Sequence, residues 1–139
     1  MKRIFLLLAI SFFAHSAVAE DNSSANDAFK SVITEQLQAI ARDDGASAYA
    51  EAAPNVQQIF PSPDIFMNMV QTGYPQVYRN KQYNFGDAGT DEMGRPFQKV
   101  EILGMDGARY AAIYFMEQQA DGSWKISGVV MAKEPETES

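Results

Sequence analysis

The chain has 139 residues, 46% of them hydrophobic, and 11 basic against 18 acidic residues give a net charge of −7. This acidic balance argues against nucleic acid and anionic membrane surfaces as partners, because both carry dense negative charge. There is no cysteine and the single histidine, His15, lies near the N-terminus. Beyond that segment we therefore expect no disulfide, no thiol or imidazole catalysis, no zinc or copper site and no cofactor.

The first 19 residues have the three parts of a secretory signal peptide. Lys2 and Arg3 form the basic start, residues 4–14 the apolar segment, and Ala-Val-Ala at 17–19 the cleavage motif. The apolar run is shorter than the ~20 residues that a membrane-spanning helix needs. The sequence thus predicts a periplasmic protein cleaved after Ala19, with no stable membrane anchor. Nine basic and eighteen acidic residues remain after cleavage.

One domain is predicted over residues 27–133. The flanking segments 20–26 and 134–139 are polar and acidic, and this composition predicts a disordered lead-in and a disordered tail. Apolar residues spaced three and four apart predict a helix over 27–42, stopped by Gly45. A short helix at 46–53 and one or two helical turns after Pro54 follow.

Residues 62–73 carry helix signals at both ends. Ser62 suits the N-cap, Pro63 the first helical position and Asp64 the positive end of the helix dipole. Gly73 is predicted to be the left-handed residue of a Schellman motif, with Pro75 preventing continuation.

Strands are predicted in the second half of the chain. Residues 81–85 alternate, and a solvated loop is expected over 86–96, before three further strands. Asp106-Gly107 and Asp121-Gly122 separate these strands, and Asp-Gly between strand-like runs predicts two-residue hairpin turns.

Two-residue turns would fix which residues share a face of the sheet. One face is then apolar and is predicted to be the core wall, made of Val100, Ile102, Ala111, Ile113, Phe115, Trp124, Ile126, Gly128 and Val130. The outer face would carry the interface candidates Tyr110, Tyr114, Met116, Val129 and Met131. Such a cluster favours contact with a second copy or another protein. The alternative is a partly apolar exposed face shielded by lysines.

The order of elements resembles the nuclear-transport-factor-2-like cone, also called cystatin-like. This α+β fold packs N-terminal helices on a curved antiparallel sheet of about four strands. The segments QLQAIARDDGASAYAEAAPNVQQIF, MVQTGYPQVYR and DGSWKISGVVM are similar to the exported bacterial family called domain of unknown function 4864. The resemblance implies this fold and export, and it brings no catalytic residues.

The function predicted from the sequence is that of an exported, non-enzymatic domain. It would bind a small apolar ligand in the cone, or it would bind a protein through the outer sheet face, for example a second copy of the chain in a homodimer. The ligand-pocket candidates are Tyr78, Arg79, Tyr83, Phe115 and Trp124. One alternative is a cone-type isomerase or cyclase that uses tyrosine and carboxylate groups, with Tyr49, Asp64 and Tyr83 as candidates. The other is a structural envelope protein without a pocket.

Overall fold

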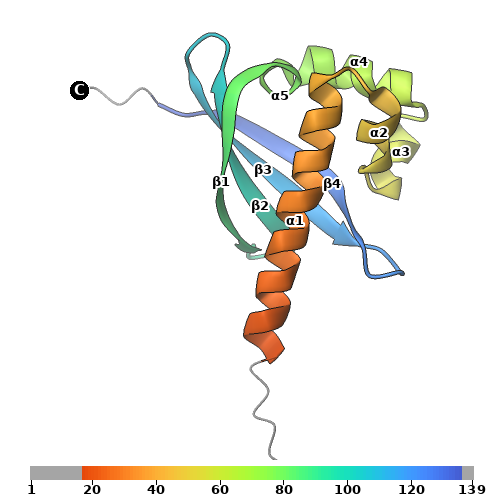
Figure 1. The fold of residues 1–139 in the computed structure, drawn as a ribbon, viewed down its shortest axis with the longest axis vertical. Coiled ribbons are helices and arrows are strands. Elements are labelled where there is room, and N and C mark those ends of the chain that lie inside the picture. The colour runs from red at the N-terminus through yellow and green to blue at the C-terminus, as the bar shows by residue number, and fades with distance from the viewer. Residues whose placement is uncertain (1–16, 136–139) are drawn as a thin grey trace, which may run out of the picture.

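The computed structural model describes residues 17–135. Most of the predicted signal peptide, residues 1–16, and the end of the predicted tail, 136–139, lie outside the described residues. In the part that is described, helices precede a four-stranded antiparallel sheet, which confirms the α+β class (Figure 1). The helices are α1 (Ala17–Ala41), α2 (Gly45–Ala50), α3 (Pro54–Ile59), α4 (Pro63–Gly73) and α5 (Pro75–Tyr78). The strands are β1 (Asn80–Thr90), β2 (Pro96–Gly104), β3 (Arg109–Gln118) and β4 (Trp124–Lys133).

Helix α1 is longer than the helix predicted over 27–42. It begins at Ala17, so residues 20–26 are helical and not the disordered lead-in that their composition predicts. Packing offsets the polar composition, because Ala25 lies against the core and Phe29 is buried. The Phe29 ring meets Trp124 edge-on, with 4.8 Å between centroids. Among the described residues, no helix is both long and apolar enough to cross a membrane.

A Schellman motif does occur in this protein, but it ends α1 and not α4. Asp43 has φ of +57°, its N–H donates to the Ile40 carbonyl, and the Asp44 N–H donates to the Ala39 carbonyl. These are the two backbone bonds of the motif, and aspartate tolerates the left-handed conformation better than most residues. Gly45, predicted to stop the helix, is instead the first residue of α2.

The end of α4 has a different cause from the one predicted. Gly73 remains helical, without positive φ, and Tyr74 is the residue that leaves the helix, at φ −135°. A residue before proline is pushed out of the helical region, so Pro75 ends α4 through Tyr74 and then begins α5. The predicted start of α4 is confirmed, because the Ser62 hydroxyl accepts a hydrogen bond from the Ile65 N–H at 3.2 Å.

All three hairpins use the same three-residue turn. The turns span residues 91–95, 104–108 and 119–123. In each, the N–H of the first residue donates to the carbonyl of the fifth, and the N–H of the fourth residue, a glycine, donates to the carbonyl of the first. Gly94, Gly107 and Gly122 have positive φ, whereas Asp106 and Asp121 do not. A two-residue turn of type I′ would need positive φ at both central residues. The predicted two-residue turns are therefore wrong, and the loop expected over 86–96 shrinks to the residues between Asp91 and Arg95.

The turn between β2 and β3 shifts the predicted register by one residue. Val100 pairs with Ala112 and Ile102 with Tyr110, so alternate residues of β3 turn to the other face of the sheet. Tyr110, Ala112, Tyr114 and Met116 are buried under the helices. The predicted core-wall residues Ala111, Ile113 and Phe115 lie on the outer face.

A bulge in β4 explains why the prediction for that strand is half right. Met116 pairs with Ile126 and Phe115 pairs with Gly128, which leaves Ser127 as the extra residue. Trp124 and Ile126 therefore face the helices as predicted, together with Val100 and Ile102 of β2. Beyond the bulge, Val129 and Met131 face inward, and the predicted core residues Gly128 and Val130 face outward.

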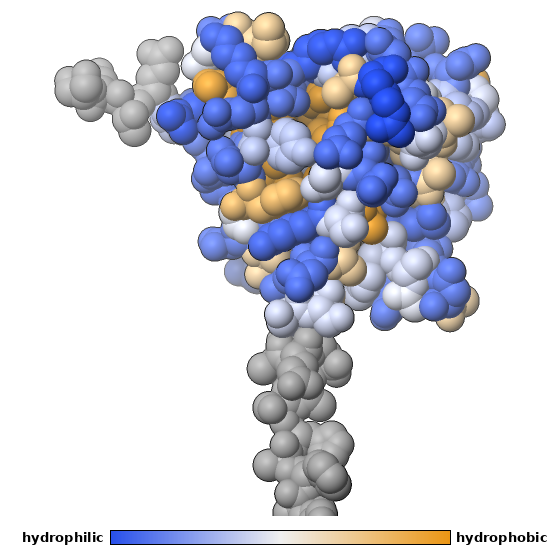
Figure 2. All heavy atoms as spheres, in the orientation of Figure 1, coloured by the Kyte–Doolittle hydropathy of each residue, from blue (hydrophilic) through white to orange (hydrophobic). Residues whose placement is uncertain are grey.

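The helices cover the inner face of the sheet and the core lies between the two layers (Figure 1). Coverage is uneven. On the face seen in Figure 2, the surface over α2 is mostly hydrophilic, whereas apolar side chains show between α1 and β1. Tyr83, Phe85 and Ala88 of β1 are correspondingly only partly buried against the core.

Candidate ligand cavity

An apolar cavity of about 350 Å³ lies between α1, α3, α4, α5 and the β4 side of the sheet. This volume falls within the range of small-molecule binding sites. Its lining divides into a deep part and a mouth. The deep part consists of buried side chains from α1, α4, α5, β3 and β4, including Gln36, Ile40, Val70, Val77 and Tyr114.

Helix α3 and the β4 bulge form the mouth. Val56, Ile59 and Phe60 line one side, and residues 127–129 line the other. No residue of α3 is buried, and Ile59 is 68% exposed. An exposed isoleucine beside an apolar cavity gives the mouth a hydrophobic rim.

Polar contacts hold α3 in place over the cavity. The Tyr49 hydroxyl donates to the Phe60 carbonyl at 2.7 Å, and the Gln57 amide donates to the Tyr49 carbonyl at 3.0 Å. Asn55 donates to the Ser127 carbonyl at 3.0 Å, which joins α3 to the bulge in β4. Proline begins the helix at Pro54 and follows it at Pro61, so α3 is a short rigid cover with defined ends.

Two polar side chains interrupt the apolar deep wall. Gln36 is 4% exposed, and its amide donates to the Ala48 carbonyl at a long 3.3 Å, while its Oε1 receives no hydrogen bond from the described residues. Tyr114 is fully buried and its hydroxyl has no hydrogen-bond partner among the described residues. By contrast, the Tyr74 hydroxyl is satisfied, because it donates to the Val129 carbonyl at 3.0 Å.

The electrostatics of the cavity are those of a neutral site. None of the described side chains that line it is charged. Burial raises the pKa of Tyr114 far above its usual range, with smaller contributions from Tyr74 and Tyr83, so its hydroxyl stays protonated. The nearby Glu51 does not line the cavity, and burial raises the pKa of its carboxyl. The described residues hold no group of three or more His, Cys, Asp or Glu that could bind a metal.

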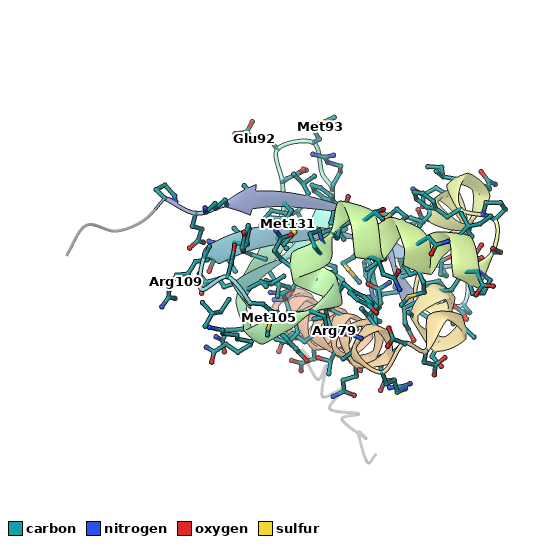
Figure 3. The ribbon with its side chains drawn as sticks, turned by 90° about the horizontal axis from the view of Figure 1, so that it is seen from above. Arg79, Glu92, Met93, Met105, Arg109 and Met131 are labelled. Atoms are coloured by element: carbon teal, nitrogen blue, oxygen red, sulfur yellow. The ribbon has the colours of Figure 1, made fainter. Side chains whose placement is uncertain are left out.

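The ligand candidates Tyr78 and Arg79 brace the end of α1 and do not line this cavity. The Tyr78 hydroxyl donates to Asp43 at 2.6 Å, and the Arg79 guanidinium donates to the other Asp43 oxygen at 2.9 Å. Arg79 also donates to the Ile40 carbonyl at 3.3 Å and stacks 3.9 Å above the Tyr78 ring. Figure 3 shows Arg79 where α5 meets the end of α1. A cation at a helix C-terminus is favourable, so the contacts of Tyr78 and Arg79 are explained by their contribution to the stability of the fold.

The other three ligand candidates are dispersed. Tyr83 faces the helices from β1 and meets Phe85 edge-on. Trp124 packs on Phe29. Phe115 lies on the outer face, with the Arg95 guanidinium 4.2 Å above its ring. None of the three is among the residues that line the cavity.

The outer-face assignment of the five interface candidates is wrong. Tyr110, Tyr114 and Met116 are buried, and Val129 and Met131 pack partly buried against the same core. Figure 3 shows the Met131 side chain on the side of β4 that faces α5. The cause is the one-residue register shift in β3 and the bulge in β4.

Most of the cavity residues are ones that the sequence did not single out. Gln36 stands on the buried stripe of α1 between Ile33 and Ile40, and a polar residue at a core position is an informative signal. Ser127-Gly128 within a strand pattern is a bulge signal. The empty volume itself has no sequence signature, because it depends on how α3 and α4 sit on the sheet.

Comparison with protein families gives a match over residues 22–139, to a family described as Domain of unknown function (DUF4864). The match covers all the described strands and every helix except the start of α1. Comparison with curated proteins gives no match.

Proposed function

The chain belongs to the family Domain of unknown function (DUF4864), whose description names no activity, and from its cavity we propose that it binds a small, mainly apolar ligand. One observation carries this proposal: a cavity of about 350 Å³ with an apolar wall, a buried tyrosine hydroxyl without a partner among the described residues, and a mouth beside the exposed Ile59. A well-packed domain of this size ordinarily fills such a space with side chains.

Export to the periplasm is part of the proposal. The basic start, apolar segment and Ala-Val-Ala motif support a signal peptide cleaved after Ala19. The family match begins at residue 22, just beyond that point. The finer fold assignment, a nuclear-transport-factor-2-like cone, is likewise proposed, and it is supported by the N-terminal helices on a four-stranded antiparallel meander.

Binding is favoured over the isomerase or cyclase alternative. Such an enzyme needs a carboxylate base beside hydrogen-bond donors. The carboxylate candidate Asp64 is exposed in the first turn of α4, and the lining described above includes no Asp, Glu, His, Lys or Arg side chain. A purely structural role would leave the cavity and its orphaned hydroxyl without a purpose.

Native mass spectrometry tests the proposal. The chain is purified without detergent from the cells that produce it, and a bound small molecule is expected at one per chain. Val56→Trp, which fills the mouth from α3, should abolish this adduct. Gln58→Trp, on the exposed side of the same helix, should keep it. A wild-type chain that carries no adduct and binds no apolar dye would overturn the proposal.

A homodimer through the outer sheet face is a second candidate, now with different residues. Two cross-strand pairs lie side by side on that face, Phe97 with Phe115 and Ile113 with Val130. Val130 is 59% exposed, which favours an isologous pairing with a second copy. Light scattering coupled to size-exclusion chromatography should then give twice the chain mass, and half that mass for Val130→Asp. A wild-type monomer at high concentration would rule this out.

A further inference from the structure

The polarity of the cavity changes with depth. Its incompletely paired polar groups, Gln36 and Tyr114, belong to fully covered residues of α1 and β3. Its rim is largely hydrophobic, with Ile59 exposed and Val56 and Phe60 half-buried, and it also includes Asn55 and Ser127. The Asn55 amide donates to the Ser127 carbonyl at 3.0 Å, so the less completely paired amide of the lining is the buried one of Gln36.

Gln36 is built to bond something that the chain itself does not supply. Its amide nitrogen has only the long contact to the Ala48 carbonyl, which the Glu51 N–H already satisfies at 3.2 Å. Its Oε1 is left without a donor among the described residues. A buried amide in an apolar wall is costly unless it gains a partner.

The lining also selects on charge. The described residues of the lining include no cation, so an anionic headgroup would be desolvated without compensation. They include no carboxylate either, so the same holds for a cationic headgroup. The acidic net charge of the chain disfavours anions further.

Building on the proposed function, we infer that the ligand is an uncharged amphiphile that binds with its polar end inward. Its single hydroxyl or carbonyl group bonds the Gln36 amide, and its apolar end lies at the mouth beside Ile59. A cavity of ~150 Å³ holds one benzene, so this one suits roughly 10 to 15 non-hydrogen atoms.

Competition against a fluorescent dye tests the inference. Anthracene is a fluorescent hydrocarbon small enough for this volume. It is uncharged and has no hydrogen-bonding group, so it reports on the cavity independently of Gln36. Decan-1-ol and decanoate have the same chain length and differ in headgroup charge. At neutral pH decan-1-ol should displace the dye at a concentration about tenfold lower than decanoate does.

Two leucine variants of α1 separate the anchor from general effects on the helix. Gln36→Leu removes the buried amide, and Gln38→Leu makes the same change at an exposed position. Gln36→Leu should lower the affinity for decan-1-ol by about 3- to 10-fold and leave the affinity for the dye unchanged or higher. Gln38→Leu should alter neither affinity.

The outcomes distinguish the inference from the function beneath it. Absence of dye binding to the wild-type chain would overturn both the proposed function and the inference. Dye binding with equal competition by decan-1-ol and decanoate would overturn the uncharged ligand while the cavity function stands. Equal affinities for decan-1-ol in Gln36→Leu and Gln38→Leu would overturn the inward orientation. Should Gln36→Leu fail to fold, Gln36→Met replaces it, with Gln38→Met as its control, and the same loss of decan-1-ol affinity is expected.

Discussion

Tyr78 and Tyr114 carry the same phenol group but differ in burial and in hydrogen bonding. Tyr78 lies at the surface end of α5, and its hydroxyl donates to Asp43 at 2.6 Å under a stacked guanidinium. Tyr114 is fully buried in β3, and its hydroxyl has no partner among the described residues. A site that completes its own hydrogen bonds needs no ligand, whereas an incomplete one loses stability that a ligand could restore. Tyr78 thus contributes to stability, whereas Tyr114 lies beside the proposed binding site.

Tyr114→Phe should sharpen this difference and have the larger effect. Removal of a buried, unpaired hydroxyl should raise the free energy of unfolding of the ligand-free chain by about 1 kcal/mol. Urea denaturation followed by circular dichroism measures this as a higher midpoint with an unchanged slope. A lower midpoint would mean that the hydroxyl has a partner in the folded chain, and the comparison would fail.

Tyr78→Phe should lower the free energy of unfolding, by a smaller amount than Tyr114→Phe raises it. The Tyr78 hydrogen bond is the main reason that the Asp43 pKa lies below its usual value, and the same bond raises the Tyr78 pKa. A lowered carboxyl pKa stabilises the fold above the ordinary value of 3.8, and this contribution is lost as the pH falls through the folded-state pKa. A raised phenol pKa stabilises below the ordinary value of 10.0, and this contribution is lost above it.

The melting temperature of Tyr78→Phe should therefore fall below that of the wild type at neutral pH. The gap should shrink under acid conditions below pH 3.8 and again in strong alkali above pH 10.0. Because the groups are exposed, solvent screens the interaction and the gap stays small. A gap that is independent of pH would show that Tyr78 acts through packing alone.

Helices, strands and their order follow from the sequence, but the sheet register does not. Asp-Gly suits both a two-residue turn and a three-residue turn in which only the glycine is left-handed. The alternation in β3 cannot decide between them, because Tyr110, Ala112, Tyr114 and Met116 and the intervening Ala111, Ile113 and Phe115 are apolar on both faces. The bulge at Ser127 then reverses the faces within one strand.

The candidate site was less predictable than the fold, for a related reason. Tyr78 and Arg79 follow a helix end and have the residue types of a binding site. Their partner Asp43 is far away in the chain, so the hydrogen bonds that they make to it are not predictable from the sequence. Gln36 interrupts an apolar stripe of α1, which is a signal in the sequence, but its place in the cavity wall depends on how the helices pack on the sheet.

The contact between the helical half and the last strand also has a consequence for the order of events during synthesis. Ile126 donates to the Glu51 carbonyl and accepts from the Ala53 N–H, which joins the end of α2 to β4. Both this link and one wall of the cavity come from β4, the last of the described strands in chain order. Contacts between such distant segments form late, because a long loop must close first. A nascent chain that ends before Trp124 therefore has neither, so the cavity is completed only after β4 has been synthesised.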